Sequence, residues 1–189
     1  MHLVAYVVCD MTVPVPRVWS AGDRMDANLM NDITDAIMFA LRPPEVQVER
    51  RAVQALTTGA FNAISFDTVV RDTHGFFSAL TPTLVTVKVA GWYWLEYVMS
   101  WQSTGTLGQF VTSGVYVNGT AADQFILRQD TLTNISATNP LGEVVNRRAE
   151  HVYFQVGDVL DLAASQMEAK QTSTISDRYP QLTLRWASS

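Results

Sequence analysis

The segment VAGWYWLEYVMSW, residues 89–101, predicts a β-strand that is apolar on both of its faces. Successive side chains of a strand point to opposite faces of its sheet. One face would carry the large side chains Tyr93, Leu95, Tyr97, Met99 and Trp101. The other face would carry Trp92, Trp94 and Val98, with only Glu96 and Ser100 as polar members. The first face can fill the core of a domain, whereas the second needs a different cover.

Short segments with the same period of two lie on both sides of this strand. They are residues 46–55, 61–66, 84–90, 109–117, 122–128, 143–156, 159–164 and 181–186. Turn-forming residues separate them, and Asn118-Gly119 and Gly157-Asp158 predict hairpin turns. The polar stretch 129–145 predicts a long loop or a poorly ordered edge. This pattern is typical of an antiparallel β-sandwich or barrel.

Two elements precede the strands, so the predicted divisions are residues 1–22, 23–44 and 45–189. Prolines make the first an extended arm. The second predicts a helix that begins at Asp23 or Asp26 and ends at Pro43-Pro44. Its apolar stripe can dock on the following domain or associate with copies of itself. The residues of that stripe are Leu29, Ile33, Ile37 and Leu41.

The composition of the 189 residues fits one globular domain with an appendage. Only 16% are charged and 48% are hydrophobic, so part of the surface is expected to face protein. The net charge of −5 and the lack of a basic run argue against nucleic-acid binding. Cys9 is alone, so no internal disulfide is expected. The opening residues lack a basic start and the length to span a bilayer, so no membrane contact is expected.

No catalytic or cofactor motif emerges, and we expect neither an enzyme nor a metal site. His2, His74 and His151 lack the spacing that places two imidazoles on one metal ion. Asp67 and Asp72 could offer oxygens to calcium, although turn formation is the favoured interpretation. Two carboxylate pairs could mimic the catalytic pair of a glycosidase, namely Asp158 with Asp161 and Asp123 with Asp130. A structural role is the favoured interpretation for both pairs.

The order of these segments resembles the jelly roll of the complement-component and tumour-necrosis-factor type. Gly91-Trp92-Tyr93 opens a long aromatic strand, and a later strand ends in Val117-Asn118-Gly119. VYFQVGDVLDLAASQ and a closing Leu182-Thr183-Leu184-Arg185-Trp186 complete the pattern over about residues 46–189. In that family a Gly-x-Tyr begins a core strand and a Gly-Asp turn joins the two strands before the last. The resemblance implies an antiparallel jelly-roll sandwich.

The N-terminal residues resemble the start of many minor tail, fibre and head-fibre proteins of bacteriophages that infect actinobacteria. The matching residues are Pro16-Arg17-Val18-Trp19-Ser20-Ala21-Gly22-Asp23, followed by Met25, Asn28, Met30, Asn31 and Asp35. In those proteins a short arm, an Asn-containing helix and a Pro-Pro stop precede a jelly roll. This resemblance implies a virion structural protein, made in the host cytoplasm and carried on the phage particle. The leading ten residues lie outside the pattern.

Jelly rolls of this type are usually trimers, which suggests a cover for the second face of the aromatic strand. The resemblance places Trp92, Trp94 and Val98 at the interface of a homotrimer, with a pentamer or hexamer as the less expected symmetry. The arm would attach to tail or capsid proteins through Pro14, Pro16, Val18 and, above all, Trp19. The head could contact host cell-wall carbohydrate. The alternatives are a carbohydrate-binding module, a capsid decoration protein without a receptor role, and a glycan-degrading enzyme.

Overall fold

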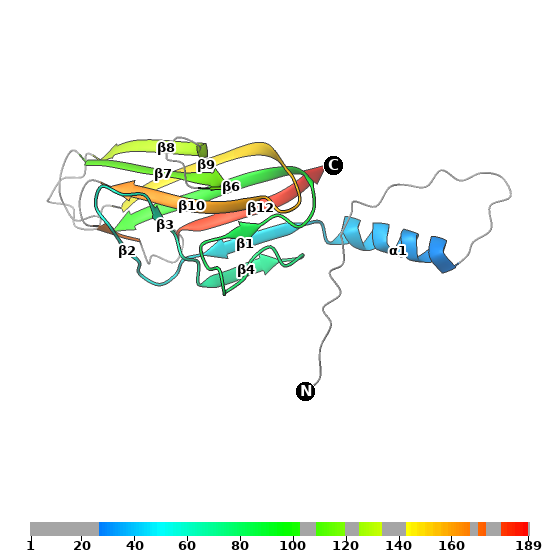
Figure 1. Cartoon of the computed structure of the whole chain (residues 1–189). Coiled ribbons are helices and arrows are strands. Elements are labelled where there is room, and N and C mark those ends of the chain that lie inside the picture. The colour runs from blue at the N-terminus through cyan, green and yellow to red at the C-terminus, as the bar shows by residue number, and fades with distance from the viewer. Residues whose placement is uncertain are drawn as a thin grey trace, which may run out of the picture.

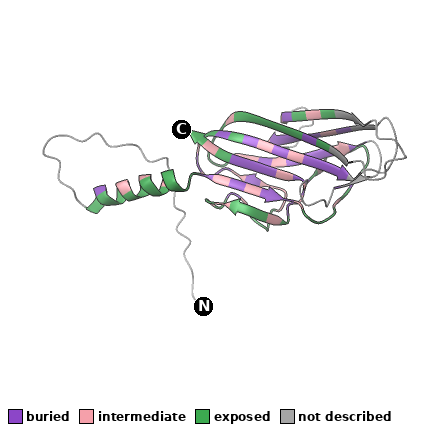
Figure 2. Cartoon of the chain, turned by 180° about the vertical axis from the view of Figure 1, so that it is seen from behind, coloured by how far each residue is buried: buried purple, intermediate pink, exposed green. Residues whose placement is uncertain are grey.

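The computed structural model describes residues 27–102, 109–119, 125–133, 143–166, 170–172 and 179–188. Within these residues two β-sheets pack face to face, and a helix leaves one end of the sandwich roughly along its long axis (Figure 1). The view from behind shows that most of the helix is exposed, whereas buried positions run along the strands of the sandwich (Figure 2).

The first sheet is built around β6 (Gly91–Gln102), and we call it the β6 sheet. β6 pairs with β12 (Gln181–Ser188) on one side and with β9 (Glu143–Phe154) on the other. β1 (Glu45–Glu49) and β4 (Thr68–Asp72) extend the sheet beyond β12. The order is β4-β1-β12-β6-β9, with every pair antiparallel.

The second sheet, the β7 sheet, has the order β3-β10-β7-β8. Its strands are β3 (Asn62–Ala63), β10 (Val159–Gln166), β7 (Gln109–Val117) and β8 (Phe125–Thr133), and β5 (Val85–Thr86) also pairs with β10. β2 (Ala55–Leu56) and β11 (Lys170–Gln171) form a separate two-stranded ladder. The predicted all-β sandwich is confirmed, while the predicted arm lies outside the described residues.

The core lies between the two sheets, and the inward face of β6 is its centre. All five large side chains predicted for that face are fully buried. Two of them also bond to the backbone. The Tyr93 hydroxyl donates to the Val89 carbonyl at 2.7 Å, and the Tyr97 hydroxyl donates to the Ser113 carbonyl of β7 at 3.0 Å. Tyr97 therefore links the β6 sheet to the β7 sheet across the core.

Three predicted strands are shorter in the structure. The segment 46–55 divides into β1 and β2 because the Asp67 carboxylate accepts hydrogen bonds from the backbone N–H groups of Arg51 and Ala52 at 2.9 and 2.8 Å. These groups are then unavailable to a ladder. The segments 61–66 and 84–90 pair only over β3 and β5. Val85, Val87 and Val89 nevertheless point inward, as the period of two predicts.

The turns differ from the predicted hairpins. Gly157-Asp158 joins β9 of one sheet to β10 of the other, and β8 begins only at Phe125, so Asn118-Gly119 does not close a two-residue hairpin. Instead the side-chain amide of Asn118 makes two hydrogen bonds. Its Nδ2 group donates to the Asp158 carboxylate at 2.6 Å, and its Oδ1 atom accepts from the Val159 N–H at 2.8 Å. The two turns therefore hold each other in place.

The stretch 129–145 is also more ordered at its ends than the predicted loop. β8 continues to Thr133 and β9 already begins at Glu143. The end of β8 pairs with β7, where Gln129 lies opposite Ser113, and the start of β9 pairs with β6, where Val145 lies opposite Ser100. Backbone hydrogen bonding to these neighbours outweighs the weak strand propensity of the polar side chains. Residues 134–142 lie outside the described residues.

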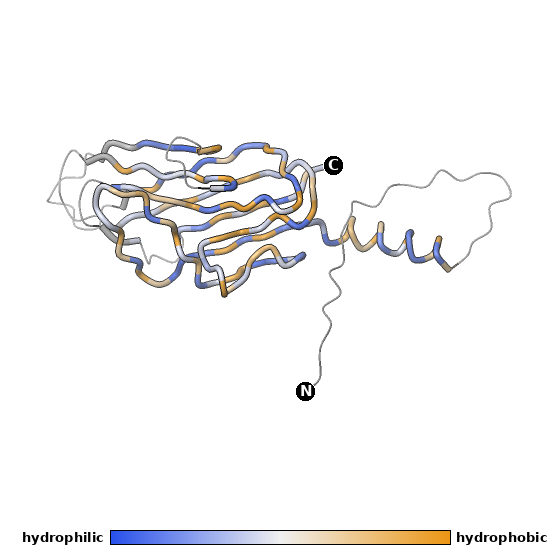
Figure 3. The backbone as a smooth tube through the Cα atoms, in the orientation of Figure 1, coloured by the Kyte–Doolittle hydropathy of each residue, from blue (hydrophilic) through white to orange (hydrophobic). Residues whose placement is uncertain are grey.

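The helix α1 (Ala27–Leu41) ends just before Pro43-Pro44, as the sequence predicts. Apolar and polar positions alternate around it (Figure 3). The chain then enters β1, and the Pro44 carbonyl accepts a hydrogen bond from the Trp186 N–H at 2.9 Å. The helix is thus joined to the sandwich within three residues of its end.

Gly91, which opens β6, should tolerate no side chain. Its φ of 152° disfavours residues with a Cβ atom, and a Cβ there would lie 2.5 Å from Trp186 Nε1 and 2.6 Å from the Ser188 carbonyl oxygen. We expect Gly91→Ala to lower the free energy of unfolding by about 2 to 4 kcal/mol. In Gly59→Ala, with a φ of 72° and nothing within 4 Å, the loss should be about 1 kcal/mol. Urea unfolding measures both, and equal losses would contradict this account.

Candidate functional site: the outer face of the β6 sheet

The outward side of β6 carries two exposed indoles. Trp92 and Trp94 alternate with the buried residues of the core face, and their exposed fractions are 40% and 46%. Val98, further along the same side, is half-buried. β6 is hydrogen-bonded to a neighbouring strand on each side, so its backbone cannot rotate to turn these side chains inward. Their exposure therefore follows directly from the placement of the core face.

β9 adds two more rings beside them. The antiparallel register sets Tyr153 opposite Trp92 and His151 opposite Trp94, so all four side chains share one face. The Trp92 ring stacks on His151 with centroids 5.1 Å apart and meets Tyr153 edge to face at 5.6 Å. We call Trp92, Trp94, His151 and Tyr153 the aromatic patch. Tyr153 is 43% exposed, so the patch is open to a partner.

Two carboxylates on this face, those of Glu96 and Glu45, already have positive partners. Glu96, next to the patch on β6, forms an ion pair with Arg147 of β9. Glu45 of β1 binds two guanidinium groups, those of Arg71 at 2.7 Å and Arg185 at 3.0 Å. The Glu45 and Glu96 side chains are each only 13% exposed. Burying this face would therefore leave no carboxylate of these pairs without a positive partner.

These features suit binding to another macromolecule more than chemistry. Exposed, contiguous large apolar rings on a monomer usually mark an interaction site. Val145, 38% exposed, lies opposite Ser100 and is separated from the aromatic patch along β9 by Arg147. Trp and Tyr rings bring large, rigid contact areas whose burial dominates many interfaces. The arrangement can therefore cover a flat apolar surface or stack on a ring of a ligand.

The structure places the predicted site residues that it describes in two separate regions. Trp92, Trp94 and Val98 share the outer face, and their role at an interface stays a prediction. Solvent exposure of the predicted helix residues increases toward the sandwich: Leu29 is buried, Ile33 is half-buried, and Ile37 and Leu41 are exposed. The arm residues Pro14, Pro16, Val18 and Trp19 lie outside the described residues.

Sequence reasoning missed His151 and Tyr153. Both lie in a segment that was expected to be a strand, at exposed positions on either side of the half-buried Val152. Their place beside Trp92 and Trp94 depends on the register between β6 and β9, which are separated by a long connection. An alternating His-x-Tyr in a strand was the available signal, but it does not name the partner strand.

The carboxylates considered for calcium or glycan chemistry have structural roles. Asp72 accepts hydrogen bonds from the backbone N–H groups of His74, Phe76 and Phe77. Asp158 accepts from Asn118 and from the Gln155 N–H at 2.7 Å. Desolvation acts to raise the pKa of Asp67, but the backbone hydrogen bonds from Arg51 and Ala52 outweigh it and lower the pKa.

The remaining candidates are a partly buried histidine and a carboxylate pair that the structure describes only in part. Burial lowers the pKa of the His74 imidazole, with the nearby Asp72 acting in the opposite direction. Asp130 bonds to Thr112 and Arg128, and Asp123 lies outside the described residues. In the described part of the chain, no group of three or more His, Cys, Asp or Glu is placed to hold a metal ion.

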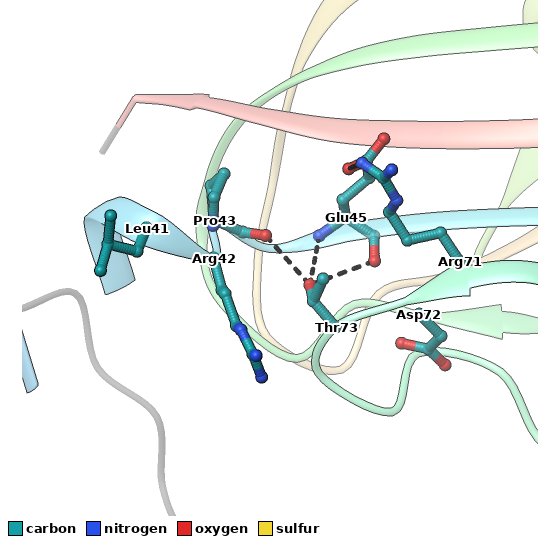
Figure 4. Close-up of a pocket in the computed structure, with 7 residues that line it drawn as sticks. All are labelled: Leu41, Arg42, Pro43, Glu45, Arg71, Asp72 and Thr73. Carbon is teal, nitrogen blue, oxygen red and sulfur yellow. Dashed lines mark hydrogen bonds and ion pairs between the residues drawn. The ribbon is translucent and has the colours of Figure 1, made fainter. Parts of the chain in front are cut away.

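A cavity of about 360 Å³ lies where α1 meets the β6 sheet (Figure 4). The Thr73 hydroxyl accepts from the Glu45 N–H at 2.9 Å and lies 3.0 Å from the Pro43 carbonyl oxygen. These bonds tie the segment after the helix to the end of β4. The cavity thus marks the joint between helix and sandwich, and the groups that line it mostly bond to one another. Its lining residues are Leu41, Arg42, Pro43, Glu45, Arg71, Asp72 and Thr73.

Comparison with solved structures identifies the fold. The globular domain of the zebrafish complement 1qA protein matches with a TM-score of 0.55 and 14% identity, over 76% of this chain and 96% of that domain. Murine APRIL at pH 5.0 matches with a TM-score of 0.55 and 10% identity, over 75% and 98%. Eiger TNF from S. frugiperda matches with a TM-score of 0.54 and 12% identity, over 77% and 95%. The chain therefore has the jelly-roll fold of the complement C1q and TNF type, as the sequence predicts.

Two further comparisons return nothing. No protein-family model and no curated protein matches the sequence, so the resemblance to phage proteins stays a prediction. The described part of the chain contains no helix with the length and apolarity needed to cross a bilayer.

Asp161 on β10 should make stability depend on pH. Its Oδ1 atom is buried without a hydrogen-bond partner, and burial raises the pKa of the carboxyl to about 6 from an ordinary value of 3.8. The folded state holds this proton more tightly than the unfolded state. The resulting stability is complete below about pH 4 and is lost as the pH rises through about 6.

We therefore expect Asp161→Asn to stabilise the protein at about pH 8 by about 1 to 2 kcal/mol, after allowance for solvent screening. The difference from wild type should shrink as the pH falls, and urea unfolding over a pH series measures it. Asp130→Asn is the matched control, because hydrogen bonds and Arg128 lower the pKa of Asp130 despite its partial desolvation. That variant should not be stabilised, and a pH-independent effect of Asp161→Asn would refute the prediction.

Proposed function

We propose that the chain is a virion structural protein of a bacteriophage, built as a homotrimer that projects a jelly-roll head. The observation that carries the trimer is the aromatic patch, exposed on a face whose Glu45 and Glu96 carboxylates are ion-paired. The virion assignment rests on the resemblance of residues 16–35 to phage tail and fibre proteins. The head carries no catalytic role in this proposal and can contact the host surface.

The position of the patch suits a cyclic assembly. The aromatic patch lies over β6 and β9 at one edge of the sheet, whereas the ion pair of Glu45 on β1 with Arg71 on β4 lies at the other. In a cyclic assembly one edge of each sheet meets the opposite edge of the next copy. Three such faces inclined about an axis would cover the patch and leave the β7 sheet open to solvent.

A second candidate function is a monomeric carbohydrate-binding module. The specific observation for it is Trp94, whose ring is 46% exposed and lies opposite Arg185 of β12 on the same face. Indole rings stack on sugar rings, and a nearby guanidinium can donate to hydroxyl groups. A decoration protein without a receptor role would use the same trimer. The oligomeric state separates the module from the two virion roles.

The combined change Trp92→Ser and Trp94→Ser should convert the trimer to monomers. Wild type is expected at about 63 kDa by multi-angle light scattering, three times the chain mass of 21.0 kDa. Loss of two buried indoles per interface should weaken association by at least about a thousandfold. The control is Leu80→Ser, which removes an apolar side chain that is 93% exposed on a loop.

The control should stay trimeric, and both variants should keep the circular dichroism spectrum of a β-protein. A monomeric wild type at micromolar concentration would refute the trimer and favour the carbohydrate-binding module. An unchanged mass of the double variant would instead move the interface away from the aromatic patch.

The arm is proposed as the part that attaches to the particle. Pro14 and Pro16 hold it extended, and Val18 and Trp19 offer apolar anchors. Deletion of residues 1–22 should leave the trimer intact and abolish incorporation into assembling particles, because the apolar anchors are lost. Trp19→Ala should lower incorporation at least about tenfold if it is the principal anchor. Normal incorporation of the deletion variant, measured in purified particles, would move attachment to the helix or the jelly roll.

A further inference from the structure

The helix α1 presents an apolar stripe away from the protein. Its 15 residues span about 22 Å. Met30, Ile37 and Leu41 are exposed by 48%, 52% and 70%, and Ile33 is half-buried. These four side chains recur at spacings of three and four, so they lie along one side of the helix. We call them the helix stripe.

The helix docks on the sandwich with its other side. Phe39 is the anchor, because its ring meets Trp186 edge to face at 4.9 Å and His74 at 6.2 Å. At 3.6 residues per turn, Phe39 lies about 160° around the helix from Ile37. A helix that only needed to cover its apolar side would dock with the helix stripe. The observed contact leaves the stripe for a partner.

The charges of the helix lie on the docked side as well. Asp32 and Asp35 fall about 140° to 160° from Ile37, as does Arg42 just beyond the last turn. Met30, Ile33 and Ile37 of the helix stripe, followed by Ala40, occupy the a and d positions of a heptad pattern, and Leu41 falls at the adjacent e position. The a and d seam is therefore uncharged, and identical helices can meet along it without like-charge repulsion.

The joint to the sandwich keeps the helix near the proposed axis. Only Arg42, Pro43 and Pro44 separate α1 from β1, a strand of the sheet whose outer face forms the proposed interface. The Phe39 contact and the Thr73 bonds hold the helix in line with the long axis of the sandwich (Figures 1 and 4). One rotation axis can then bring together both the aromatic patches and the helix stripes of three copies.

We propose that α1 forms a parallel three-stranded coiled coil on the axis of the trimer, with the helix stripe as its seam. This inference rests on the trimer proposed above and adds a second contact along the same axis. A helix of this length is marginal alone in water, so packing against its copies would supply its stability. The coil would form a short stalk between the jelly-roll heads and the arms.

Thiol cross-linking on the full chain tests the coil directly. Cys9→Ser removes the single native thiol, and either Ile37→Cys or Asp35→Cys then adds one. A bis-maleimide with a reach below one helix diameter joins only residues that face the seam. Ile37→Cys should give one linked pair per trimer. Asp35→Cys, on the side of the helix opposite the helix stripe, is the matched control. Ile37→Cys should give at least about ten times as much linked product as Asp35→Cys. Thiols that face each other within a coil have a high effective concentration, which speeds their cross-linking.

The outcomes separate the coil from the trimer. Suppose that light scattering gives the mass of three chains, but the two variants link equally or neither links. That result overturns the coil and leaves the trimer in place. A wild-type mass of one chain overturns the trimer itself. Should Ile37→Cys alter the mass, Met30→Cys, one heptad earlier, repeats the test with the same expected result.

Discussion

Strand β6 is hydrogen-bonded along both of its edges, to β12 and to β9, and the rest of the structure depends on this constraint. A strand held on both sides can only place its side chains alternately in and out. Tyr93, Tyr97 and Trp101 are needed in the core, so Trp92 and Trp94 must lie outside. A change of register by one residue would exchange the two sets and leave the core with Glu96.

The outer face combines exposed rings with charges that are already paired, and this combination lowers the cost of covering it. Desolvating an unpaired carboxylate would oppose association strongly, whereas Glu45 and Glu96 lose little solvent contact when the face is buried. Apolar burial of the rings contributes roughly 25 cal/mol per Å² of area removed from water. The face therefore combines exposed apolar rings with paired charges, and both features favour the association proposed above.

Much of the fold could be predicted because it depends on local periodicity. The inward face of β6, the inward valines of residues 85–89 and the end of α1 at Pro43-Pro44 all follow from neighbouring residues. Features that depend on distant partners could not be predicted. The Asp67 carboxylate accepts the backbone N–H of Arg51 and so removes it from strand pairing after β1. Only the register between β6 and β9 brings Tyr153 to Trp92. The side on which α1 docks depends on the Phe39 contact with Trp186, far along the chain.

The central claim is that the aromatic patch is covered in the protein as it exists in solution. Hydroxyl-radical footprinting with mass spectrometry reports the solvent exposure of individual Trp side chains, and the fully buried Trp101 supplies an internal reference. In the proposed assembly Trp92 and Trp94 should be protected nearly as well as Trp101. Oxidation of Trp92 and Trp94 at the rates expected for rings that are 40% and 46% exposed would contradict the account.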